Sequence, residues 1–167
     1  QLLDALSTDF PKLRFRISSL EPTEITEDLL HLIAERDNLM PHLHIPLQSG
    51  DDTILSLMNR RYSTSDFKHT IELCRKYVPD AAIGIDLLTG FPGETEQLAR
   101  NTEQFLNSLE FTYLHVFPFS SRKGTQAAQM KGSVPQRIKE QRAGRLRELS
   151  KQHQESFYLR HLHSVRQ

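Results

Sequence analysis

The chain has 167 residues, enough for one domain with a hydrophobic core, and its formal net charge is zero. Its single cysteine excludes an internal disulfide and a multi-cysteine metal site, and makes a reducing, cytoplasmic location the default expectation. The sequence shows no signal peptide and no apolar run of about 20 residues, so we expect no membrane partner, and its first residue, Gln rather than Met, leads us to expect a piece of a longer protein.

Four β-rich runs alternate with helical patterns along the chain. They cover residues 13–20, 43–48, 81–89 and 111–117. Strands that alternate with helices at intervals of about 30–40 residues, without hairpin dipeptides between them, are typical of parallel βαβ units. The sequence therefore predicts an α/β fold with a parallel sheet.

The helices between and after these strands are predicted from caps and from apolar spacing. The first begins after Thr26, the second has a cap at Asp51 or Asp52, the third has a cap at Thr64 or Ser65, and the fourth carries apolar positions between Leu98 and Leu109. Val134-Pro135 opens a long last helix that we expect to end near His163.

Side-chain alternation divides two of the strands into an apolar and a polar face. Asp86 shares a face with Gly84, opposite a set of isoleucine and leucine residues. In the preceding strand, His44 and Gln48 likewise oppose leucine and isoleucine residues. Burying an ionised carboxylate without a partner in an apolar core costs roughly several kcal/mol of free energy. We therefore expect the polar faces to line the interior of a barrel that bears a site.

Polar groups also follow the ends of neighbouring strands. Glu21, Gln48 and Asp86 lie at or near three such ends, where parallel α/β folds bind ligands. Arg60 or Arg61 could supply the cation that offsets Asp86 and could grip a ligand carboxylate. The simpler alternative is an ion pair that ties a helix to a strand.

Other candidates give weaker signals. His42 and His44 have the i, i+2 spacing of some metal ligands, but without a third ligand they are better interpreted as hydrogen-bonding histidines, so no metal site is predicted. Cys74 lies on the apolar side of a helix and is interpreted as a core residue. The run 89–93 predicts a tight turn that lets backbone approach a ligand.

Four motifs in order resemble a known family. They are RISSLEP at residues 16–22, HIPLQSG followed by LMNRRY at 44–50 and 57–62, DLLTGFPGET at 86–95, and HVFPFSSRKGT at 115–125. Together they resemble the radical S-adenosylmethionine (radical SAM) methylthiotransferases. The first and last motifs are most similar to the subgroup that modifies N6-threonylcarbamoyladenosine next to the anticodon of tRNA.

The resemblance implies a fold and a division of the chain. Residues 1–130 would form strands three to six of a partial parallel (β/α) barrel of the radical SAM type. Residues 131–167 would form a basic helical extension toward an RNA-binding domain. This segment holds 9 Lys and Arg against 3 Asp and Glu, whereas residues 1–130 hold 12 against 18. The extension could contact tRNA phosphates or serve as a charged linker helix.

The resemblance also implies the site residues. The cofactor-binding residues for S-adenosylmethionine would be Glu21 near the amine or ribose, Gln48 and Asp86 at the ribose and amino-acid part, Arg60 at the carboxylate, and Gly90 and Phe91 near the adenine. The substrate-binding residues would be Ser120, Arg122 and Lys123, of which the two basic ones could instead face only solvent. No catalytic residue and no metal ligand is predicted in the chain.

Several parts of the family pattern are absent from the sequence. The cluster-binding CxxxCxxC motif is not present, and one cysteine cannot hold a four-iron cluster, which needs about three or four thiolates. We therefore expect the fragment alone to be inactive. The iron–sulfur clusters, the one-electron reduction of S-adenosylmethionine and the hydrogen abstraction by its 5′-deoxyadenosyl radical would belong to the longer parent.

Two other functions stay open from the sequence. One is another radical SAM enzyme of the heme-pathway oxidase type, against which the loop PFSSRKGT argues. The other is a non-catalytic RNA-binding or scaffold fragment, which the basic C-terminal segment favours. A half-barrel would also leave two open sheet edges, so self-association is expected.

Overall fold

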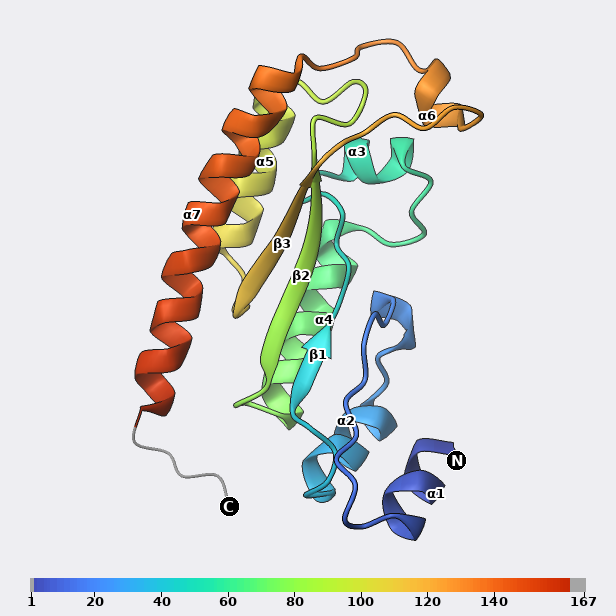
Figure 1. Cartoon of the computed structure of the whole chain (residues 1–167), viewed down its shortest axis with the longest axis vertical. Coiled ribbons are helices and arrows are strands. Elements are labelled where there is room, and N and C mark those ends of the chain that lie inside the picture. The colour runs from blue at the N-terminus through green and yellow to red at the C-terminus, as the bar shows by residue number, and fades with distance from the viewer. Residues whose placement is uncertain (1, 163–167) are drawn as a thin grey trace.

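A parallel three-stranded sheet forms the centre of the computed structural model, which describes residues 2–162. Its strands are β1 (His42–His44), β2 (Ala82–Thr89) and β3 (Tyr113–Pro118), in the order β1–β2–β3. Both strand pairs are parallel, as Figure 1 shows. This arrangement confirms the predicted parallel α/β fold.

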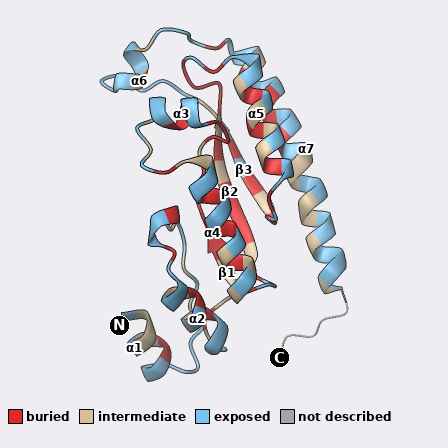
Figure 2. Ribbon diagram, turned by 180° about the vertical axis from the view of Figure 1, so that it is seen from behind, coloured by how far each residue is buried: buried red, intermediate tan, exposed pale blue. Residues whose placement is uncertain are grey.

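Three of the longer helices cover one face of this sheet, and the others lie toward its ends. Along the chain they are α1 (Leu2–Asp9), the 3-10 helix η1 (Pro22–Glu24), α2 (Glu27–Glu35), α3 (Asp52–Leu57), α4 (Thr64–Tyr77), α5 (Glu96–Asn107), α6 (Gln126–Gln129) and α7 (Gln136–His161). Figures 1 and 2, seen from opposite sides, show α4, α5 and α7 against one face of the sheet, while no helix of residues 2–162 crosses the other face. None of the helices within residues 2–162 combines the length and apolarity needed to cross a membrane.

Two of the three helix caps predicted from the sequence are confirmed. Thr26 accepts a hydrogen bond from the Leu29 N–H, and Asp51 accepts from two N–H groups of α3, as predicted. The cap of α4, however, is Ser63 rather than Thr64 or Ser65. The Ser63 side chain accepts from the Asp66 N–H and the Asp66 side chain accepts from the Ser63 N–H, and this capping box satisfies two backbone donors at the start of α4.

The apolar faces of the strands form the core, as the alternation predicts. Six side chains of the two central segments are fully buried beneath the helices: Leu43, Ile45, Leu47, Ile83, Ile85 and Leu87. Burying a side chain of this size contributes about 1.5–3 kcal/mol relative to leaving it exposed. The polar face of the same strands is consequently held in place by the packing on the opposite face.

The prediction of a strand at residues 13–20 is wrong. Phe15 forms only an isolated bridge with Leu39, and the Leu20 N–H donates to the His44 carbonyl at 3.0 Å. Between these two contacts the ladder is interrupted, because Ser19 has a φ of 59°, in the left-handed region that strands exclude. Residues 13–20 therefore run alongside β1 and the residues just before it as an extended coil.

Helix α7 packs along β3. It begins one residue after Pro135, as predicted, and ends at His161, while the expected end at His163 lies outside the described residues. The Leu114 N–H donates to Ser150 Oγ at 2.8 Å, and Arg147 donates to the Val116 carbonyl at 3.3 Å. Side chains of α7 thus form hydrogen bonds with backbone groups at an edge of the sheet that we expected to be open. Self-association stays a prediction.

Candidate functional site on the polar face of the sheet

The polar face centres on Asp86 and His44. The two side chains lie on the neighbouring strands β2 and β1, with His44 Nε2 2.7 Å from Asp86 Oδ1. They are 21% and 16% exposed, so most of their surface is removed from water. The sequence suggested Arg60 or Arg61 as the partner of Asp86. That prediction is wrong for Arg60, whose guanidinium pairs with Glu21 instead.

His42 continues this face toward the start of the strands. Arg16 Nε donates to His42 Nδ1 at 3.0 Å, and His42 Nε2 lies 2.8 Å from the Tyr113 hydroxyl. Burial, followed by the charge of Arg16, lowers the pKa of His42 below its usual value. The Tyr113 ring covers Gly84, where any Cβ would meet the ring. Both histidines are hydrogen-bonded, as predicted.

His115 of β3 belongs to the same cluster, although the sequence analysis did not select it. It pairs in register with Asp86, and its ring meets the His44 ring edge-on at 5.5 Å. One potential ligand atom from each of His44, Asp86 and His115 lies within 4.8 Å of the others. Two imidazoles and a carboxylate can hold a divalent metal ion. Alternation along residues 113–117 was the signal that could have found His115.

Glu21 and Arg60 form an ion pair where the extended coil ends. Arg60 Nη1 lies 3.1 Å from Glu21 Oε1, and the side chains are 30% and 48% exposed. Tyr62 donates its hydroxyl proton to the carbonyls of Pro46 and Leu47, which fixes the Arg60 loop to the continuation of β1. Burial raises the pKa of Tyr62 to about 12, so this donor keeps its proton.

Gln48 lies directly beside β2. Its N–H donates to the Asp86 carbonyl at 2.8 Å, and its own carbonyl accepts from the Leu88 N–H at 2.9 Å. Gln48 has a φ of 69°, so the chain turns sharply out of the strand here. The Gly50 N–H donates to Thr102 Oγ1 at 3.2 Å, which fastens this turn to α5. Gln48 and Asp86 therefore come together on adjacent parallel segments, as predicted.

The buried side chains of Glu94 and Phe91 shape the turn after β2. The Gly90 N–H donates to Glu94 Oε1 at 2.9 Å, and Gly90 has a φ of +73°, which favours glycine. Phe91 is 5% exposed and packs edge-to-face on Phe119, with ring centroids 5.1 Å apart. The structure therefore buries the Phe91 side chain rather than presenting it on the surface.

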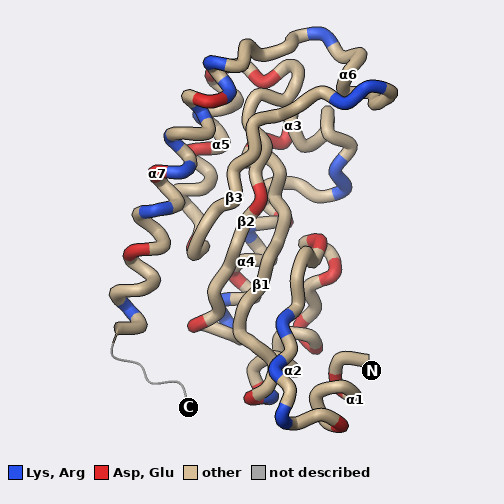
Figure 3. The backbone as a smooth tube through the Cα atoms, in the orientation of Figure 1, with Lys and Arg blue, Asp and Glu red and all other residues tan. Residues whose placement is uncertain are grey.

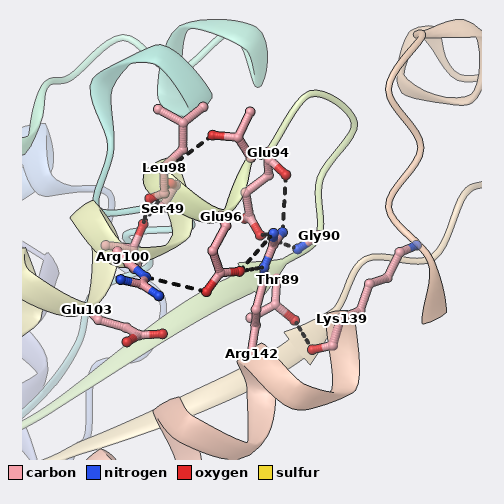
Figure 4. A network of polar contacts seen from close by, with 12 residues as sticks. Ser49, Thr89, Gly90, Glu94, Glu96, Leu98, Arg100, Glu103, Lys139 and Arg142 are labelled. Atoms are coloured by element: carbon pink, nitrogen blue, oxygen red, sulfur yellow. Dashed lines mark hydrogen bonds and ion pairs between the residues drawn. The ribbon is translucent and has the colours of Figure 1, made fainter. Parts of the chain in front are cut away.

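Glu94 is held by α7 (Figure 4). Arg142 donates to Glu94 Oε1 at 2.6 Å and to the Glu94 carbonyl at 3.1 Å, and also reaches Glu96. Burial raises the pKa of Glu94, while the Gly90 N–H and Arg142 act in the opposite direction. We expect the carboxylate to stay ionised at neutral pH, because a charged guanidinium lies at hydrogen-bond distance.

The predicted substrate residues form an exposed loop. Ser120, Arg122 and Lys123 lie between β3 and α6, and all three are exposed. Within residues 2–162 no hydrogen bond joins them to Glu21, Gln48 or Asp86. The structure thus places Gln48 beside Asp86 and pairs Glu21 with Arg60, while within residues 2–162 no hydrogen bond or ion pair links these two pairs to each other or to the loop.

Basic residues of α7 have acidic partners within the chain. Figure 3 shows basic positions of α7 beside acidic positions of α5. Arg145 pairs with Glu96 and Glu103, and Arg142 with Glu94 and Glu96. Lys139 and Arg142 are buried, which removes them from the set that could contact tRNA phosphates.

Cys74 is unsuited to an iron–sulfur cluster. It is the only cysteine of the sequence, it is fully buried in α4, and burial raises the pKa of its thiol to about 12. A cluster ligand has to be a thiolate that reaches the iron. The residues of this chain therefore do not fit such a cluster, whereas carboxylates, an amide and a guanidinium are groups that can bind a sulfonium amino acid with a ribose.

Comparison with known proteins places this geometry in context. The family model described as "Radical SAM superfamily" matches residues 3–106. The threonylcarbamoyladenosine tRNA methylthiotransferase MtaB of Bacillus subtilis is 41% identical over 139 residues, which cover 83% of this chain and 31% of that protein. A tRNA-2-methylthio-N(6)-dimethylallyladenosine synthase of Thermobifida fusca is 42% identical over 136 residues, covering 81% of this chain and 28% of that protein.

Among solved structures, coproporphyrinogen III oxidase (HemN) of Escherichia coli superposes with a TM-score of 0.66 and 21% identity, over 83% of this chain and 32% of that one. This likeness concerns the fold. The chain spans about a third of the length of the curated relatives it matches.

Proposed function

The chain belongs to the Radical SAM superfamily, and from this premise we propose that it is the cofactor-holding part of an enzyme that adds a methylthio group to N6-threonylcarbamoyladenosine in tRNA. The observation that carries the proposal is the position of Gln48 and Asp86 on adjacent parallel segments. The ion pair of Glu21 and Arg60 adds to it, because the neighbouring residues Leu20 and Tyr62 bond to the backbone of residues 44–47. Relatives at 41% and 42% identity that modify tRNA adenosines support it.

Each polar group has a role that its chemistry allows. Arg60 binds the cofactor carboxylate through its planar guanidinium, and Glu21, released from their exposed ion pair, accepts from the amine. Gln48 and Asp86 bind ribose hydroxyls, because an amide both donates and accepts and a carboxylate accepts. His44 holds the Asp86 carboxylate in orientation. S-adenosylmethionine, when bound, supplies the radical chemistry, and this chain orients it.

Activity resides in the longer parent. The chain spans about a third of its curated relatives and offers one buried cysteine, so the iron–sulfur ligands come from elsewhere in the parent. The isolated chain is inactive. A tRNA substrate implies a cytoplasmic location for the parent.

The choice of nucleoside rests on the sequence motifs. The two relatives named above act on different adenosines and are almost equally similar to the chain. RISSLEP at residues 16–22 and HVFPFSSRKGT at 115–125 favour threonylcarbamoyladenosine over dimethylallyladenosine. The exposed Arg122 and Lys123 of the second motif are the candidates for contact with the tRNA anionic backbone.

The test is an assay of the complete protein with its clusters reconstituted, supplied with S-adenosylmethionine, reductant and tRNA. Mass spectrometry of the digested tRNA should show a methylthio group on threonylcarbamoyladenosine. Methylthiolation of dimethylallyladenosine alone would contradict the nucleoside assignment. Cofactor cleavage without a methylthio product would favour another radical SAM reaction, and tRNA binding without cofactor cleavage would favour the RNA-binding fragment.

A further inference from the structure

A buried ion pair joins α7 to the turn that follows β2. Arg142 Nη1 lies 2.6 Å from Glu94 Oε1, and the side chains are 6% and 5% exposed. Arg142 also donates to the Glu94 backbone carbonyl at 3.1 Å. Two charges this far from water are held at a considerable desolvation cost, so removing either partner is far more disruptive than removing a surface pair.

The same carboxylate fixes the backbone of the turn. Glu94 Oε1, the atom that Arg142 contacts, also accepts the Gly90 N–H at 2.9 Å (Figure 4). Two hydrogen bonds that share this oxygen thereby link the guanidinium of α7 to the Gly90 backbone. Gly90 reaches its φ of +73° without strain, but glycine has many other conformations open to it, so the hydrogen bond to Glu94 is needed to select this one.

Lys139, one turn earlier in α7, contacts the same turn from a second direction. Its carbonyl accepts from Thr89 Oγ1 at 3.2 Å, and its side chain fills the space that a Cβ on Gly90 would need. Lys139 Nζ donates to the Phe119 carbonyl at 2.8 Å, directly before the Ser120–Lys123 loop. The start of α7 therefore braces both the turn after β2 and the segment after β3.

We propose that Arg142 is a positioning residue, which acts through Glu94 to hold the turn of residues 89–93 in the conformation that receives the cofactor adenine. This inference rests on the proposed function, which places S-adenosylmethionine at the carboxyl ends of the strands. In this inference α7 supports the cofactor site, which differs from the two roles predicted from the sequence, contact with tRNA and a linker to another domain. Its charged residues near the start of the helix serve the cofactor turn.

Loss of the guanidinium has a defined consequence. Arg142→Gln leaves the Glu94 carboxylate buried without its countercharge, so the carboxylate turns toward water or takes up a proton. Either change weakens the Gly90 hydrogen bond, while Ala143 and Leu146 still pack α7 on the sheet. The turn then loosens without unfolding of the helix.

The experiment compares Arg142→Gln with Arg145→Gln in the complete protein. Arg145 is the matched control, because it lies on the same helix and also pairs with Glu96, but it is 43% exposed. Hydrogen exchange reports on the amides of residues 90–93, equilibrium dialysis gives the S-adenosylmethionine dissociation constant, and tRNA binding is measured at several salt concentrations.

Arg142→Gln should speed exchange at residues 90–93 and weaken cofactor binding about 10-fold, because the loosened turn has to be ordered again when the cofactor binds. The salt dependence of tRNA binding should stay unchanged, and Arg145→Gln should alter neither exchange nor cofactor affinity. Unchanged cofactor affinity in folded Arg142→Gln, or a reduced salt dependence of tRNA binding, overturns the inference.

Glu94→Gln combined with Arg142→Gln keeps the inference testable if the single variant fails to fold. The amide oxygen of Gln can still accept the Gly90 N–H, and no charge stays buried, so the double variant should recover most of the exchange protection and cofactor affinity. A folded double variant with no recovery contradicts the role of Glu94 as intermediary. Failure of the wild-type protein to bind S-adenosylmethionine would instead contradict the proposed function.

Discussion

His44 Nε2 lies 2.7 Å from Asp86 Oδ1, across the parallel pair of β1 and β2. The histidine thus takes the position that an arginine was expected to fill, and it orients a carboxylate on the face of the sheet that no helix covers in the described part of the chain. Arg60 pairs instead with Glu21, and because this ion pair is partly exposed, a ligand can open it without a large desolvation cost.

Arg60→Gln in the complete protein should weaken binding of S-adenosylmethionine about 10-fold, because a bidentate guanidinium–carboxylate contact is replaced by a weaker neutral one. Arg61→Gln is the control, since Arg61 is the adjacent arginine and is exposed. Isothermal titration of both variants checks the prediction. Equal affinities for the two variants would remove Arg60 from the site.

The sequence predicted the scaffold better than the contacts between side chains. Alternation in residues 43–48 and 81–89 depends only on strand periodicity, and the structure buries the apolar set as expected. The partner of Asp86 could not be read in the same way, because His44 and Arg60 are both polar residues near a strand end and only the register decides between them. Residues 13–20 likewise have a composition suited to a strand, but the positive φ of Ser19 interrupts the strand conformation, and composition does not reveal this.

The role of α7 shows the same limit. A run of arginine and lysine residues indicates a charged helix, but the acidic partners of Arg142 and Arg145 lie more than forty residues away in the sequence. Such long-range pairing is set by how α7 packs beside α5, which composition does not encode. The role of Glu94 could have been predicted only from its position as an acidic residue directly after a glycine-containing turn.

Gly84→Ala and Gly144→Ala should have opposite effects on stability. A Cβ on Gly84 would meet the Tyr113 ring, so this change should lower the free energy of unfolding by about 1–3 kcal/mol through overpacking. Gly144 lies inside α7 with open space around its Cβ position, so alanine there should raise stability by about 0.5–1 kcal/mol.

Urea unfolding of the 167-residue chain measures both variants. Replacing Tyr113 with Leu should restore part of the stability lost in Gly84→Ala. Without such rescue, the cause of the loss would not be contact with the ring.

Stability should fall as the medium is acidified from neutral pH. Burial, before any other cause, lowers the pKa of His153 below its usual value of 6.5, and its ring stacks on Phe111 at 3.9 Å. Since the unfolded chain takes up the proton first, the contribution of His153 is complete above pH 6.5 and declines as the pH falls toward the lowered folded-state pKa.

Free energies of unfolding at about pH 7.5 and about pH 5.5 would show this decline. His153→Phe retains the stacking on Phe111 but removes the titrating group, so it should show a shallower pH dependence. A slope equal to that of the wild type would assign the effect to other groups, of which His42 is the first candidate because its pKa is lowered as well.

Cys74 should be unreactive while the chain is folded. It is fully buried and its thiol has a pKa of about 12, so little thiolate exists at neutral pH. A thiol reagent should label it only after denaturant unfolds the protein. Rapid labelling under native conditions would show that α4 opens more readily than its packing implies.

The most direct test of the cofactor site is the affinity of the complete protein for S-adenosylmethionine when Asp86 is replaced by alanine. Glu72→Ala, at an exposed position of α4, serves as the control for a lost carboxylate. We predict that Asp86→Ala weakens binding about 10-fold or more, the cost expected for losing a hydrogen bond to a charged group, while Glu72→Ala binds as the wild type does. Wild-type affinity in folded Asp86→Ala would contradict the assignment of the polar face of the sheet as the cofactor site.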